Sequence, residues 1–136
     1  MNLCGSSKAS NHQVLIVDDN PDNLILLQYI LEDSGYITYT ANCGKIALAM
    51  VEAHPPNLII LDLMMPDMNG IEVAEHIRQN PYTQNMPIVL VTGCMVNISN
   101  ENHKLVNKIL SKPFDGNELL SQLDLLIKDT DSLLIN

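Results

Sequence analysis

The sequence alternates between short apolar runs and longer stretches whose apolar residues recur with the period of a helix. The predicted strands are VLIVD (14–18), YITYTA (36–41), NLIILD (57–62), PIVLVT (87–92) and KILS (108–111). The predicted helices are residues 21–34, 44–53, 70–79, 99–107 and 115–128. Strands that alternate with helices form parallel sheets, and right-handed crossovers then place helices on both faces. The expected fold class is therefore α/β, with a doubly wound five-stranded parallel sheet.

The length of the chain suits one domain. It has 136 residues and an apolar content of 46 %, which is too high for a disordered chain. We expect residues 1–12 to form a flexible polar arm, residues 13–128 the folded domain and residues 129–136 a short tail. The apolar residues 133–135 of the tail either extend the last helix or pack on a neighbour. A tail this short favours a stand-alone protein over a piece of a larger chain.

Charge and cysteine content exclude several classes of protein. The chain has 7 basic and 16 acidic residues, a net charge of -9, and no basic run to hold nucleic acid or an anionic membrane. Cys4, Cys43 and Cys94 lie far apart without metal-ligand spacing, which favours reduced thiols over a zinc site or disulfides. The sequence contains neither a signal-peptide pattern nor a run of about 20 apolar residues, so we expect a cytoplasmic protein.

Polar residues stand at the ends of four predicted strands. They are Asp18 and Asp19 after the first strand, Asp62 at the end of the third, Thr92 at the end of the fourth and Lys112 after the fifth. Each alone has an ordinary explanation as a turn former, helix cap, strand former or surface charge. In a parallel sheet, however, the carboxyl ends of the strands share one edge, where binding groups gather. The combination therefore predicts one pocket.

The chemistry of these five residues is coherent. Three neighbouring carboxylates repel one another unless a cation lies among them, and oxygen ligands suit a hard ion such as Mg²⁺. A metal ion held by two of the acids can leave the third carboxylate, Asp62, free to attack a phosphorus atom and form an acyl phosphate. The Lys112 ammonium and the Thr92 hydroxyl would neutralise phosphoryl oxygens. The pattern predicts a phosphoacceptor site with Asp62 as the nucleophile.

Four segments, in this order, resemble the response-regulator receiver family: VLIVDDNPDN, IILDLMMPDMNG, IVLVTG and ILSKPF. The resemblance covers roughly residues 13–128 and is specific, because four separate blocks match at plausible separations. It implies the flavodoxin-like (βα)5 receiver fold of single-domain, CheY-like proteins and a role in two-component signal transduction. The implied partners are a sensor histidine kinase or a histidine phosphotransfer protein as donor, and a downstream protein that receives the signal.

The resemblance also implies roles for the residues of the pocket. Asp62 is similar to the phosphorylated residue, with Thr92 as the switch hydroxyl and Lys112 as the family's lysine. The implied metal ligands are Asp19, Asp18 acting largely through water, Asp62 and the backbone carbonyl of Met64. The bond from Lys112 to Pro113 looks like the cis peptide of this fold. The implied chemistry is phosphorylation of the chain itself, not turnover of a substrate.

The sequence departs from the family pattern at Ile109, three residues before Lys112, where the family usually carries Tyr or Phe. The usual switch moves Thr92 while that aromatic ring turns inward, so the conventional output is in question. Residues 99–107 are also polar for a helix. The surface formed by these residues and the strand after them is either a specialised partner surface or the result of loop drift.

Two positions that often govern water attack on the phosphoryl group carry Met64 and Cys94. Both side chains are weakly polar and orient a hydrolytic water poorly, so we expect slow self-dephosphorylation. Gly93, which follows Thr92, leaves access to Asp62 and fits a competent pocket.

The helix predicted over residues 21–34 offers a candidate docking surface. We expect a core-facing stripe of Leu26, Leu27, Ile30 and Leu31. Leu24 and Ile25 then lie exposed near the acidic pocket, where they would dock the helices of the phosphoryl donor. The alternative is ordinary scattered surface leucine.

Two other functions stay open from the sequence. A pseudo-receiver would bind proteins without being phosphorylated; the complete pocket argues against it, and Ile109 keeps it possible. A flavin carrier or small phosphatase would need a glycine-rich loop or a DxD nucleophile, whereas residues 18–23 are anionic and Leu63-Met64 follow Asp62. We expect a monomer or a weak homodimer; the sequence does not name the kinase or the stimulus.

Overall fold

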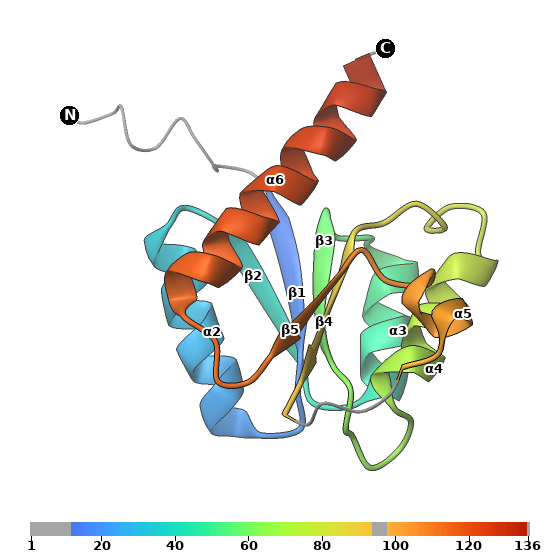
Figure 1. Cartoon of the computed structure of the whole chain (residues 1–136), viewed down its shortest axis with the longest axis horizontal. Helices are drawn as coiled ribbons and strands as arrows, with labels where there is room; N and C mark the ends of the chain where they lie inside the picture. The colour runs from blue at the N-terminus through green and yellow to red at the C-terminus, as the bar shows by residue number, and fades with distance from the viewer. Residues whose placement is uncertain (1–11, 94–97, 136) are drawn as a thin grey trace.

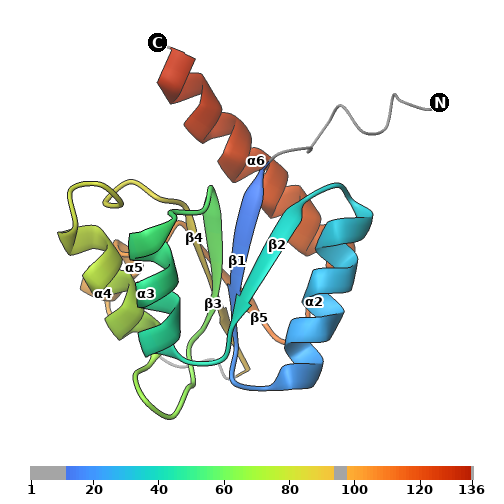
Figure 2. The same ribbon diagram turned by 180° about the vertical axis from the view of Figure 1, so that it is seen from behind.

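The computed structural model describes residues 12–93 and 98–135, with side chains up to residue 129. It contains one five-stranded parallel sheet in the order β2-β1-β3-β4-β5, with helices on both faces (Figure 1, Figure 2). The strands are β1 (Gln13–Val17), β2 (Ile37–Ala41), β3 (Leu58–Asp62), β4 (Ile88–Thr92) and β5 (Lys108–Ser111). The helices are α2 (Pro21–Asp33), α3 (Gly44–Ala53), α4 (Gly70–Gln79), α5 (Asn100–His103) and α6 (Gly116–Ile135). The predicted doubly wound α/β fold is confirmed.

The position of each strand in the sheet follows from its composition. Strands β3 and β4 lie in the middle and are buried at every position, which requires apolar residues on both faces. Strand β2 pairs only with β1 and is partly exposed at the edge of the sheet. Because neighbouring strands pair in parallel, the carboxyl ends of β1, β3, β4 and β5 lie at the same side of the sheet.

Two apolar cores hold the helices to the sheet. Helices α2 and α6 pack on one face through Leu27, Leu31, Leu119 and Leu123. Helices α3 and α4 pack on the other face through Ala47, Val51, Val73 and Ile77. Helices that cover both faces explain why the central strands are apolar throughout.

Helix α2 has clear signals at both ends. The side chain of Asn20 accepts the N–H groups of Asp22 and Asn23, and Pro21 occupies the first turn, as is common at helix starts. The helix ends just before Gly35, whose φ of 97° is a left-handed conformation that favours glycine. The observed helix ends one residue before the predicted end at residue 34.

The predicted face of α2 is partly wrong: Leu27 and Leu31 are buried as predicted, but the positions of Leu24 and Leu26 are reversed. Leu24 is buried, with 8 % of its surface exposed, whereas Leu26 is 57 % exposed. The buried residues Leu24, Leu27 and Leu31 lie within an arc of about 60° at 3.6 residues per turn. Seven of the eight positions from Leu24 to Leu31 are apolar, so the period did not decide which arc faces the sheet. Leu24 therefore belongs to the core and is not an exposed docking residue.

Two other helices differ from their predicted bounds. Helix α5 is a single turn, because it has no buried residue and Asn107 instead joins the sheet through its N–H bond to the Ile88 carbonyl. Helix α6 continues to Ile135, so most of the expected tail is helical (Figure 1). Leu119, Leu123 and Ile127 of α6 are buried.

Some expectations concern residues outside the described ranges. They are the flexible arm up to residue 11, with Cys4, and the position of Cys94. Within the described ranges, no helix combines the length and the apolar character needed to cross a bilayer.

Candidate functional site

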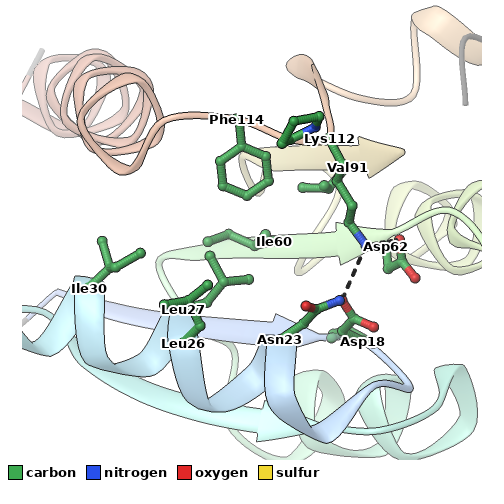
Figure 3. A pocket seen from close by; sticks show the side chains of 12 residues that line it. Asp18, Asn23, Leu26, Leu27, Ile30, Ile60, Asp62, Val91, Lys112 and Phe114 are labelled. Carbon is green, nitrogen blue, oxygen red and sulfur yellow. Dashed lines mark hydrogen bonds and ion pairs between the residues drawn. The ribbon is translucent and has the colours of Figure 1, made fainter. Parts of the chain in front are cut away.

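The carboxyl ends of the strands bring the predicted polar residues to one edge of the sheet. Asp18 follows β1, Asp62 ends β3, Thr92 ends β4 and Lys112 follows β5. Strands β1 and β3 are neighbours, and the chain order reverses between them, so this edge is the topological switch point of the sheet. Figure 3 shows Asp18, Asp62 and Lys112 pointing toward one another from three separate segments.

Three carboxylates and one ammonium form the centre of the site. One carboxylate oxygen each from Asp18, Asp19 and Asp62 lies within 4.8 Å of the other two. The Lys112 Nζ lies 3.3 Å from Asp62 Oδ1 and 3.5 Å from Asp18 Oδ2. Asp18 is 3 % exposed and Asp62 is 6 % exposed. The pocket therefore concentrates more negative charge than Lys112 alone neutralises.

The pKa of Asp62 reflects this crowding. Burial raises the pKa of the Asp62 carboxyl, and the neighbouring Asp18 charge raises it further. The ammonium of Lys112 acts in the opposite direction and offsets part of the rise. A cation placed among the carboxylates would favour the ionised, nucleophilic form of Asp62. The donor set, three carboxylates within reach of one another, fits a hard divalent ion.

Asn20 and Asn23 orient Asp18, a role that sequence reasoning missed. The N–H of Asn20 donates to Asp18 Oδ1 at 2.9 Å, and Asn23 Nδ2 donates to Asp18 Oδ2 at 3.1 Å. Asn20 also caps α2, which links the start of that helix to the acidic pocket. The Asn-Pro pair at the helix start is a capping signal in the sequence. Nothing local in the sequence points to Asn23.

Gly70 allows the chain to pass close to the end of β3. A Cβ at this position would lie 2.6 Å from the backbone oxygen of Asp62, closer than real Cβ contacts. The Gly70 N–H donates to the Leu63 carbonyl at 2.9 Å. Asn69 and Glu72 form a capping box that starts α4 at this point. The loop between β3 and α4, which contains Met64, is thus held at both ends.

Asp67, in the same loop, caps a different helix. Cys43, at the start of α3, makes no side-chain capping bond. Asp67 accepts the N–H groups of Lys45 at 2.9 Å and Gly44 at 3.1 Å instead. These bonds lower the pKa of the exposed Asp67 carboxyl. Asp67 therefore joins the loop after Asp62 to α3, across 23 residues of chain.

Thr92 and Lys112 are tied together through the backbone. Thr92 is buried, and its carbonyl accepts the Lys112 N–H at 2.8 Å. The Lys112–Pro113 peptide bond is cis, as the resemblance implied. Gly93 is exposed, and a Cβ there would meet nothing within 4 Å. The switch role of the Thr92 hydroxyl and the ligand role of the Met64 carbonyl stay predictions.

The altered switch position, Ile109, and the predicted docking surface on α2 lie on opposite sides of the sheet. Ile109 pairs with Leu90 in the sheet and packs against the core under α3 and α4. On α2, Ile25 is 64 % exposed and Tyr29 is 73 % exposed. With Leu26, they form an exposed apolar patch, named here the α2 patch, on the helix that begins beside Asp18.

Comparisons with known proteins agree with this geometry. The family model described as response regulator receiver domain matches residues 14–124. The chain is 43 % identical over 83 residues to the alkaline phosphatase synthesis transcriptional regulatory protein PhoP of Bacillus subtilis, covering 61 % of this chain and 34 % of PhoP. It is 40 % identical over 80 residues to a probable cyclic di-GMP phosphodiesterase of Vibrio cholerae, covering 59 % of this chain and 18 % of that protein.

A solved structure provides a second kind of match. The response regulator protein TrrA of Thermotoga maritima, in complex with Mg(2+)-BeF, is 31 % identical to the chain with a TM-score of 0.78. The match covers 85 % of this chain and 98 % of TrrA. The match thus extends over nearly the whole of TrrA, whereas the chain spans a third or less of the two curated relatives.

Proposed function

Because the chain belongs to the response regulator receiver domain family, we propose that Asp62 accepts a phosphoryl group from a phosphohistidine in two-component signalling. The observation that carries the proposal is the cluster of Asp18, Asp19 and Asp62 with the Lys112 ammonium 3.3 Å from Asp62 Oδ1. The donor is a sensor histidine kinase or a histidine phosphotransfer protein, and the signal passes to a downstream protein partner.

The reaction is a transfer between two nucleophiles. A carboxylate oxygen of Asp62 attacks the phosphorus, the bond from phosphorus to the donor imidazole nitrogen breaks, and an acyl phosphate forms. Asp62 is ionised when it attacks, so it needs no general base. Lys112 neutralises charge on the phosphoryl oxygens from one side, and the Thr92 hydroxyl is proposed to bind another oxygen.

The proposed metal is Mg²⁺. Asp18, Asp19 and Asp62 would hold it together with the backbone carbonyl of Met64, because clustered oxygen donors suit this ion. When bound, Mg²⁺ supplies positive charge next to the transferring phosphoryl group. Asn20 and Asn23 support this role by holding both oxygens of Asp18 in place.

The α2 patch is the proposed docking surface for the phosphoryl donor. Ile25, Leu26 and Tyr29 replace the Leu24 and Ile25 pair expected from the sequence, since Leu24 is buried. Replacing Ile25 and Tyr29 with Ser should slow phosphorylation by a phosphohistidine donor and leave phosphorylation by acetyl phosphate unchanged. Equal slowing with both donors would show that the patch does not serve docking.

Further proposals follow from the family and from composition. We propose a cytoplasmic protein that does not bind nucleic acid directly, given its net charge of -9. We also propose that the phosphorylated state is long-lived, since Met64 and the sequence position of Cys94 supply no strong hydrogen-bonding group for a hydrolytic water. A decay within seconds that Met64→Asn does not change would contradict this lifetime.

The deciding experiment measures phosphorylation directly. The protein is incubated with Mg²⁺ and acetyl phosphate, and its intact mass is recorded. We expect an increase by one phosphoryl group in the wild-type protein and none in Asp62→Asn. The matched control is Asp67→Asn, an exposed carboxylate of the same loop that lies outside the cluster. A wild-type protein that takes up no phosphate from any donor would support a pseudo-receiver instead.

A further inference from the structure

A cavity of about 370 Å³ opens beside Asp62, between α2 and the segment that follows β5. Figure 3 shows Leu26, Leu27 and Ile30 on the α2 side, Phe114 on the opposite side and Ile60 between them. This volume lies within the range of about 300–1,000 Å³ that is typical of small-molecule sites. The apolar walls would favour an aryl or alkyl group.

One end of the cavity is polar and carries an excess of negative charge. Asp18, Asp62 and Lys112 line this end, and Asp19 lies within the same carboxylate cluster. Three carboxylates against one ammonium leave an excess of two negative charges, and two of the carboxylates are buried. Buried carboxylates are costly unless a cation compensates them. The polar end is therefore complementary to a positive group.

We propose that this cavity binds a small amphipathic amine. Its ammonium group would bind beside the carboxylates of Asp18 and Asp62, where the single ammonium of Lys112 leaves negative charge uncompensated. Its apolar body would lie between Leu26, Ile30 and Phe114. The volume accommodates about twelve non-hydrogen atoms at the share of about 30 Å³ that a water molecule occupies. An anionic head would meet net repulsion, and a neutral head would leave the excess negative charge in place.

The amine and a divalent metal ion would compete, because both use the carboxylates of Asp18 and Asp62. An amine of this class would therefore block phosphorylation of Asp62 by keeping the metal away. This consequence rests on the proposed function, whereas binding of the amine does not. The site also differs from the α2 patch, since Ile25 and Tyr29 lie outside the cavity and only Leu26 belongs to both.

The test uses 4-phenylbutylamine as the probe and NMR titration of the full ¹⁵N-labelled chain without metal. We expect saturable shifts of backbone amides in α2 and around Phe114. The neutral analogue 4-phenylbutan-1-ol should bind at least about tenfold more weakly, and saturating Mg²⁺ should weaken the amine by about the same factor. Shifts elsewhere, equal binding of the alcohol or indifference to Mg²⁺ would each overturn the proposal.

Two neighbouring substitutions provide a matched pair. Leu26→Ser removes part of the apolar wall and should weaken amine binding about fivefold. Ile25→Ser changes an exposed apolar residue of the same helix that does not line the cavity, and should leave amine binding unchanged. Both residues are largely exposed, so both variants should fold. An equal effect of the two substitutions, or no effect of either, would contradict the site.

A phosphorylation assay separates the two proposals. With acetyl phosphate and Mg²⁺, the amine should lower the fraction of phosphorylated protein, and more Mg²⁺ should restore it. Bound amine that leaves phosphorylation unaffected at low Mg²⁺ would overturn the competition. If the amine binds as expected but no phosphate is ever taken up, the phosphoacceptor function fails and the amine site stands.

Discussion

The two faces of the sheet differ in how many polar side chains bridge them. Helices α2 and α6 cover one face mainly through apolar side chains, with one distant polar contact in which the Tyr36 hydroxyl donates to Asp124 of α6. A cavity reaching Asp62 lies on this side. The other face also has an apolar core under α3 and α4. At its rim, however, polar side chains bridge segments that are distant in sequence.

Arg78 is the main polar bridge of the second face. Its Nε donates to the Leu105 carbonyl at 2.9 Å, and its Nη1 donates to the carbonyls of Gln84 at 3.0 Å and Met86 at 2.7 Å. Its Nη2 donates to Asn107 Oδ1 at 3.0 Å, the same atom that accepts the Ile88 N–H at 2.8 Å. Arg78 thus joins α4 to the segments that lead into β4 and β5.

The difference indicates where the molecule can adapt. Apolar contacts are non-directional, so a helix resting on them can adjust around a ligand or partner at small cost. Directional hydrogen bonds that are partly buried, such as those of Arg78, resist such adjustment, because a lost partner costs up to about 1–3 kcal/mol. We therefore expect binding on the α2 side of the sheet to involve local adjustment. We expect the segment before Ile109 to stay fixed.

The largest effect is expected from removing the polar bridge. Arg78→Met should lower the free energy of unfolding by about 3 kcal/mol, because several carbonyl groups lose their donor. Urea denaturation provides the measurement. Lys104 is an exposed cation on the same face, and Lys104→Met should change the free energy of unfolding by less than about 0.5 kcal/mol. A similar small change for both variants would remove the distinction between the two faces.

The next effect tests the corrected face of α2. Leu24→Ala should cost about 2 kcal/mol, because it removes buried volume from the core. Ile25→Ala, one residue further on an exposed position, should cost less than about 0.5 kcal/mol. Denaturation curves of the two variants show which face of α2 is buried. Equally small costs for the two substitutions would restore the face predicted from the sequence, in which both residues are exposed.

A gain in stability is expected from Asp62→Asn without Mg²⁺. The pKa of Asp62 is raised in the folded state, so its ionisation opposes folding. The penalty is absent below the ordinary value of 3.8, grows as the pH rises toward the raised pKa, and is fully present above the raised pKa. The variant should therefore be more stable than the wild type at a pH above the raised pKa.

The pH dependence checks this cause. Unfolding of Asp62→Asn and wild type should be compared at pH 7 and near pH 4, where the gain should shrink. A gain that does not depend on pH would point to a packing effect and not to the charge of Asp62.

The smallest effect is expected at the cap of α3. The pKa of Asp67 is lowered in the folded state, so its stabilisation is present above the ordinary value of 3.8 and is lost as the pH falls through the lowered pKa. Asp67→Ala should lower the melting temperature slightly at pH 7. The difference from wild type should vanish in strong acid. An unchanged melting temperature at pH 7 would show that solvent replaces this cap.

The sequence by itself determined the fold class and the composition of the acidic pocket. Both depend on local patterns: short apolar runs make strands, and polar residues mark their ends. Once the strands are parallel, Asp18, Asp62 and Lys112 must lie at the same edge, whatever the details of packing. The start and the end of α2 also have local signals in the sequence, the Asn20-Pro21 pair and Gly35.

Only the tertiary structure decided which face of α2 is buried and how the second face is bridged. The segment of α2 from Leu24 to Leu31 is apolar nearly all round and has no preferred face until the sheet buries one. Leu24 was therefore predicted to be exposed, although it is buried. Asp67 and Arg78 act on partners 23 and 29 residues away, on groups that have no pattern in the sequence. Such contacts arise because backbone donors and acceptors that lose water on folding need partners, and the fold alone decides which side chain is near enough.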